Sequence, residues 1–142
     1  MKIMVIHGPN LNMLGLREPE IYGRQTYREL CAHIEKAGED LGHSISCVQS
    51  NCEGQLIDYI QEAFFAGYDG IIINPGAYTH YSYAIYDALK SVPVPAVEVH
   101  LSDIQNREEF RKVSVIAPAC IGQISGKGQR GYLEAMQLLA NH

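Results

Sequence analysis

Short apolar runs alternate along this chain with longer stretches of helical spacing. The apolar runs predict strands, and the uniformly apolar run GIII is typical of a strand that is covered on both faces. The predicted strands cover residues 2–6, 44–49, 70–73, 96–99 and 121–125.

The segments between these runs have the spacing of amphipathic helices. Thr26 and Glu29 have capping-box spacing, and Gly42 stands where the helix that follows them should end. The next predicted helix ends at Gly67, and two more cover residues 81–90 and 131–140. The helix that ends at Gly67 should bury one face, which is formed by Leu56, Ile57, Ile60, Ala63 and Phe64.

Strands that alternate with helices predict a parallel sheet with right-handed crossovers. We therefore expect an α/β fold, a flavodoxin-like three-layer sandwich with a five-stranded parallel sheet, formed as a single domain over residues 1–142. Ligands of such sheets lie beyond the carboxyl ends of the strands. The polar residues that follow the predicted strands are Asn10, Asn74, His80, His100 and Ser102.

Residues 7–23 form the longest predicted loop and show no apolar periodicity. Loops of this length in a compact domain are usually functional or disordered. Arg17 and Tyr22 suggest function, because a nearby cation favours the ionised form of a phenol. The alternative is that Arg17 pairs with Glu18 or Glu20 at the surface while Tyr22 packs against the protein.

Composition and charge argue against several classes of protein. A net charge of −5 argues against a nucleic-acid binder, which usually presents a basic face. The chain has no apolar run long enough to span a membrane, and its start does not resemble a signal peptide, so we expect a cytoplasmic protein. The four cysteines form no CxxC pair and should mostly be small buried hydrophobic residues.

Residues 126–131, GKGQRG, have the GxGxxG spacing of a dinucleotide-binding turn. Too little chain follows them for the next strand, which would supply the ribose-binding acid. A tight turn and close helix packing are the preferred interpretation.

Glu98 and His100 are two residues apart in a predicted strand and so point to the same face. A carboxylate in that position can orient an imidazole and raise its basicity, which is typical of acid–base catalysis. The alternative is a structural histidine. Neither His80 nor His100 has a third metal ligand at recognisable spacing, so no metal is expected.

Arg107 and Arg111 are four residues apart, which would place them on one face of a helical turn within the polar segment 101–112. Either both pair with Glu108 and Glu109 on a solvated face, or one of them faces the cleft and offers hydrogen bonds or charge to an oxygen-rich ligand. Asp87, in a predicted helix, looks like an ordinary exposed residue.

Taken together, these motifs closely resemble the type II 3-dehydroquinate dehydratases of the shikimate pathway, which leads to chorismate and the aromatic amino acids. The segments that carry the resemblance are GPNLNMLGLREPEIYG, QSNCEGQLID, INPGAYTHYS, VEVHLSD, NREEFR and GKGQRGY. They occur in the family's order and spacing over nearly the whole chain.

The resemblance implies an anti elimination of water from 3-dehydroquinate, without a cofactor. Tyr22 matches the base, and Arg17, alone or together with Arg107, would lower its pKa. Asn10 matches the residue that stabilises the enolate, and His100 matches the general acid, oriented by Glu98. The residues that match substrate-binding positions are Asn74, His80, Asp87, Arg111 and the backbone amides of Leu101 and Ser102.

Asp87 matches a residue that, in the family, reaches the site across a subunit contact. The trimers of the family assemble into dodecamers. We therefore expect a homo-oligomer. The chain departs from the family pattern at His7, Cys52, Tyr86 and Asp103. Two other classes remain as alternatives: a flavodoxin-like module that binds a flavin or nucleotide, and a catalytically inactive scaffold.

Overall fold

The five strands form one parallel sheet with the order β2-β1-β3-β4-β5. The computed structural model describes residues 1–16 and 19–142, without the side chains of residues 21 and 22. The strands are β1 (Lys2–His7), β2 (Ser44–Gln49), β3 (Gly70–Asn74), β4 (Ala96–His100) and β5 (Gly122–Ser125). The helices are α1 (Pro19–Tyr22), α2 (Tyr27–Asp40), α3 (Glu53–Phe65), α4 (Tyr83–Ser91) and α5 (Arg130–Ala140).

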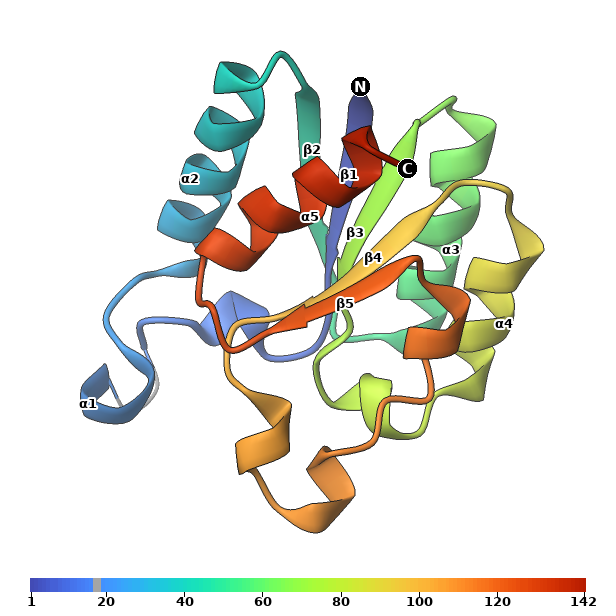
Figure 1. Ribbon diagram of the computed structural model, residues 1–142. Coiled ribbons are helices and arrows are strands. Elements are labelled where there is room, and N and C mark those ends of the chain that lie inside the picture. Colours follow the sequence, from blue (N-terminus) through green and yellow to red (C-terminus); the bar gives the residue numbers. More distant parts are fainter. Residues whose placement is uncertain (17–18) are drawn as a thin grey trace.

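Helices cover both faces of the sheet, with α2 and α5 on one side and α3 and α4 on the other (Figure 1). Side chains alternate along β1, so that Ile3 and Val5 join one apolar cluster while Met4 and Ile6 join the other. The isoleucines of β3 are likewise divided between the two clusters. The predicted fold class, including the burial of β3 on both faces, is confirmed.

Local signals position several elements as expected. Thr26 caps α2, because its hydroxyl accepts a hydrogen bond from the Glu29 amide at 3.1 Å. Gly126 and Gly128 have φ angles of 77° and 56°, which other residues rarely adopt. A Cβ on Gly131 would lie 3.2 Å from the Val99 side chain. Residues 126–131 therefore form the predicted tight turn with close helix packing.

The loops contain more structure than the sequence suggested. Residues 7–23 were expected to lack helices, but they include a 3-10 helix at Leu11–Met13 as well as α1. Another 3-10 helix, Gly76–His80, delays the start of α4 to Tyr83. Such short helices lack the repeated apolar spacing that identifies long ones.

Three smaller predictions were wrong. Arg107 and Arg111 do not share a helical turn, because Arg107 is extended between the 3-10 helices Ile104–Asn106 and Glu109–Arg111. Phe64 was expected in the core but is 44% exposed. The cysteines, all four of which are free thiols, are not mostly buried. Cys52 is exposed, and Cys31, Cys47 and Cys120 are half-buried.

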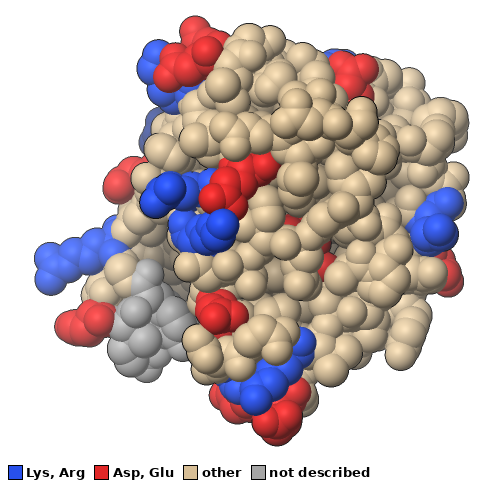
Figure 2. All heavy atoms as spheres, in the orientation of Figure 1, with Lys and Arg blue, Asp and Glu red and all other residues tan. Residues whose placement is uncertain are grey.

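Charged side chains of both signs are interspersed over the face drawn in Figure 2. No helix in the described part of the chain is long and apolar enough to cross a membrane.

Candidate active site

A cavity of about 510 Å³ lies at the carboxyl edge of the sheet. It is bounded by the segments that follow β1, β3 and β4. These segments lie below the sheet in Figure 1. The parallel strands bring these segments together, although they are far apart in the chain. The predicted site residues that line the cavity are Asn10, Asn74, His80, His100, Leu101, Ser102 and Arg111, together with Arg107.

Glu98 and His100 form a buried pair on β4. Both side chains are almost completely removed from solvent, and His100 Nε2 donates a hydrogen bond to Glu98 Oε2. Because Nε2 is engaged in this bond, Nδ1 is the ring nitrogen that can contact a ligand, and His100 lines the cavity. The predicted contact between the two side chains is therefore present.

Three further side chains hold the Glu98 carboxylate. Its oxygens accept hydrogen bonds from Thr79 Oγ1 at 2.5 Å, Ser114 Oγ at 2.8 Å and Gln123 Nε2 at 3.1 Å. Burial alone would raise the pKa of Glu98, but the hydrogen bonds from His100, Thr79 and Ser114 and the charge of His100 lower it below its usual value. Glu98 is therefore an anion at neutral pH.

The sequence analysis did not identify Thr79, Ser114 or Gln123. Thr79 lies in the 3-10 helix after β3 and Ser114 in the irregular segment before β5, and no spacing rule connects them to β4. A buried carboxylate needs several donors, so the position of Glu98 inside an apolar strand was the available signal.

Hydrogen bonds and charges orient the other polar side chains of the cavity. His80 Nδ1 donates to the Val113 carbonyl at 2.8 Å, which leaves its Nε2 as the second ring nitrogen. Arg107 Nη1 donates to Ser102 Oγ at 3.3 Å. Arg111 forms an ion pair with Glu108, with Nε 2.8 Å from Oε2. Both arginines line the cavity, and Arg111 also makes the surface pair with Glu108 that the alternative interpretation describes.

Two asparagines lie in the loops at the strand ends. Asn10 has a φ of 71°, a left-handed conformation that asparagine tolerates better than most residues. Its backbone amide donates to Asn51 Oδ1 at 3.0 Å. Asn74 is buried at the end of β3, where its Oδ1 accepts from the Gly76 amide at 3.2 Å.

Three predicted site residues remain, and the structure describes the side chain of one of them, Asp87. Asp87 is exposed on α4 and does not line the cavity. Arg17 and the side chain of Tyr22 lie outside the described residues. The backbone of Tyr22 belongs to α1, in the loop between β1 and α2. Within the described part of the chain, no three His, Cys, Asp or Glu side chains are grouped to hold a metal ion.

Comparisons with known proteins identify the family of this chain. A family model described as dehydroquinase class II matches residues 1–140. The chain belongs to the class II dehydroquinase family. The 3-dehydroquinate dehydratase of Clostridium perfringens strain 13 is 63% identical over 142 residues, which cover 100% of this chain and 97% of the relative.

Solved structures of the family have the same fold. The type II dehydroquinase of Butyrivibrio crossotus has a TM-score of 0.95 at 55% identity and covers 99% of this chain and 97% of its own. The type II dehydroquinase of Propionibacterium acnes has a TM-score of 0.93 at 40% identity, with the same coverage. Membership of this family identifies the chain as an enzyme, a hydro-lyase.

Proposed function

We propose that this chain dehydrates 3-dehydroquinate to 3-dehydroshikimate in the shikimate pathway. The observation that carries the proposal is the buried Glu98–His100 pair facing a cavity in a chain of the class II dehydroquinase family. The relatives named 3-dehydroquinate dehydratase support the same substrate. The reaction is an anti elimination that needs no cofactor.

Tyr22, as a tyrosinate, removes a proton from the carbon beside the ring ketone. This role rests on the family resemblance and on the place of α1 in the loop after β1. Arg17 lowers the pKa of the phenol, because a neighbouring cation stabilises the anion. The proton transfer turns the ketone into an enolate, and Asn10 stabilises the charge that develops on its oxygen.

His100 then protonates the departing hydroxyl group, which leaves as water while the enolate collapses to the enone. The ionised Glu98 favours this role, since a carboxylate beside an imidazole stabilises its protonated form. Nε2 is bonded to Glu98, so Nδ1 delivers the proton. Tyr22 gains one proton and His100 loses one, and exchange with solvent restores both groups.

The substrate is held by uncharged donors and by a guanidinium. The Asn74 amide and the backbone amides of Leu101 and Ser102 bind its carboxylate. His80 Nε2 and Arg111 bind its ring hydroxyls, and both residues line the cavity. Asp87 completes the site of a neighbouring subunit, which fits its exposure in the isolated chain. We therefore propose a cytoplasmic homo-oligomer, built of trimers that assemble into dodecamers.

The direct test mixes the purified protein with 3-dehydroquinate and follows the ultraviolet absorbance of the enone product. Absorbance should rise in proportion to the protein added. Treatment with borohydride in the presence of substrate should leave activity unchanged, because the mechanism forms no lysine imine. A protein that produced no enone would contradict the proposed function, and inactivation by borohydride would contradict the mechanism.

A further inference from the structure

A buried histidine outside the proposed catalytic group lies directly behind the cavity. His7 ends β1 and is fully buried. Its Nε2 lies 2.9 Å from the Tyr132 hydroxyl, and its Nδ1 lies 3.1 Å from the Tyr27 hydroxyl. The Tyr132 hydroxyl also accepts a hydrogen bond from Asn74 Nδ2 at 3.5 Å. His7 is thus joined through one hydroxyl to a residue that lines the cavity.

The donors and acceptors fix the direction of this chain of hydrogen bonds. Asn74 Oδ1 accepts from the Gly76 amide, so its Nδ2 must face Tyr132. Tyr132 is buried and accepts from Asn74, and its own proton must go to His7 Nε2. Burial lowers the pKa of His7 to about 3, so its ring is neutral and carries one proton.

That proton must therefore be on His7 Nδ1, which donates to the Tyr27 hydroxyl. The donations run in one direction from Asn74 through Tyr132 and His7 to Tyr27, and no group in this chain has to donate the same proton twice.

We propose that His7 and Tyr132 are positioning residues that lock the Asn74 amide for substrate binding. The amide has two N–H groups, and Tyr132 occupies one of them. With Oδ1 held by Gly76, the second N–H is left for an acceptor in the cavity, and a carboxylate is the strongest acceptor that a substrate can offer. The inference rests on the proposed function, because the substrate carboxylate is the group that Asn74 binds.

The kinetic test compares two tyrosine variants that each remove a hydroxyl from the same imidazole. Tyr132→Phe removes the acceptor of Asn74 and should raise KM about fivefold, with kcat changed by less than about twofold. Tyr27→Phe removes the hydroxyl on the far side of His7 and should change KM by less than about twofold. An unchanged KM in Tyr132→Phe, or equal increases in both variants, would overturn the positioning role.

A second measurement needs neither variant to fold. Nitrogen NMR of the ring of His7 in the wild-type protein should show a neutral imidazole protonated at Nδ1 from pH 8 down to pH 5. A ring protonated at Nε2 would reverse the proposed chain and overturn the inference. Failure of the proposed function would appear separately, as wild-type protein that does not convert 3-dehydroquinate.

Discussion

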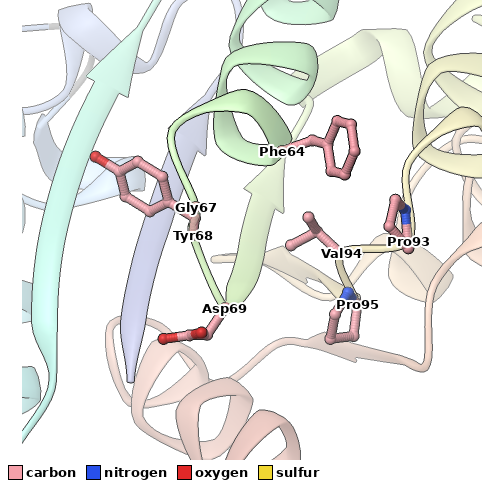
Figure 3. A pocket seen from close by; sticks show the side chains of 7 residues that line it. All are labelled: Phe64, Gly67, Tyr68, Asp69, Pro93, Val94 and Pro95. Carbon is pink, nitrogen blue, oxygen red and sulfur yellow. The ribbon is translucent and has the colours of Figure 1, made fainter.

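The two edges of the sheet carry hollows of similar size and different chemistry. The cavity at the carboxyl edge is lined by asparagines, histidines and arginines as well as apolar residues, and one of these histidines, His100, is paired with the buried Glu98. The hollow at the amino edge, about 420 Å³, lies where β3 and β4 begin (Figure 3). Its lining is Phe64, Gly67, Tyr68, Asp69, Pro93, Val94 and Pro95.

The polar groups at the amino edge serve the fold. Asp69 Oδ2 accepts from the Lys2 amide at 2.7 Å, and the Tyr68 hydroxyl donates to Ser46 at 3.0 Å. At the carboxyl edge, by contrast, a carboxylate and several polar side chains are buried, which costs free energy unless every group is paired. Buried and paired ionisable groups of this kind cluster at functional sites, so the difference between the edges favours the carboxyl edge as the proposed site of catalysis.

The largest expected effect comes from removing the phenolic hydroxyl of the proposed base. Tyr22→Phe should lower kcat about 10³-fold if Tyr22 removes the proton as proposed. Tyr68→Phe makes the same chemical change at the amino edge and should leave kcat within about twofold of wild type, at the cost of one partly exposed hydrogen bond. Steady-state kinetics with 3-dehydroquinate checks both, and near-normal turnover by Tyr22→Phe would remove Tyr22 from the role of base.

A smaller loss is expected when the orienting carboxylate becomes an amide. Glu98→Gln should lower kcat about 10- to 100-fold, because a neutral amide holds the His100 ring less firmly than the carboxylate does. It should also lower the free energy of unfolding by about 1–3 kcal/mol, since the amide nitrogen cannot accept from the donors around it.

Asp69→Asn is the matched change at the amino edge. Asparagine retains an oxygen that can accept from the Lys2 amide, so kcat should stay at the wild-type value. If Glu98→Gln and Asp69→Asn had the same kcat, the two edges would not differ in function.

The smallest predicted effect concerns the pH dependence of stability. The pKa of His7 is lowered by burial to about 3 from a usual value of 6.5. Between these values the unfolded chain binds a proton that the folded chain does not, so stability falls as the pH decreases. The contribution of His7 between pH 7 and pH 5 is a loss of about 2 kcal/mol, and His7→Asn should remove it.

His43, before β2 at the amino edge, is the matched histidine. It is half-buried, and burial together with the neighbouring N-terminal ammonium lowers its pKa. His43→Asn should leave most of the pH dependence in place. Urea unfolding at pH 7 and pH 5 measures the slope for both variants. Equal slopes in wild type and His7→Asn would show that His7 does not carry the effect.

The sequence predicted the parts of this site that follow from strand geometry. A spacing of two residues was enough to pair Glu98 with His100, and strand ends were enough to bring Asn10, Asn74 and Ser102 to one edge. The donors Thr79 and Ser114 could not be predicted, because tertiary packing of the segments between the strands places them. Asp87 matched the family pattern, but it is exposed on α4 and does not line the cavity, so its role depends on the proposed subunit contact.

The central claim is that His100, held by Glu98, acts as an acid separate from the base. The most direct measurement follows His100→Asn in deuterium oxide and records both dehydration and hydrogen exchange beside the ketone. Dehydration should fall at least about 100-fold while exchange stays within about tenfold of wild type, because the base is intact. Equal loss of both reactions would contradict a separate acid at His100.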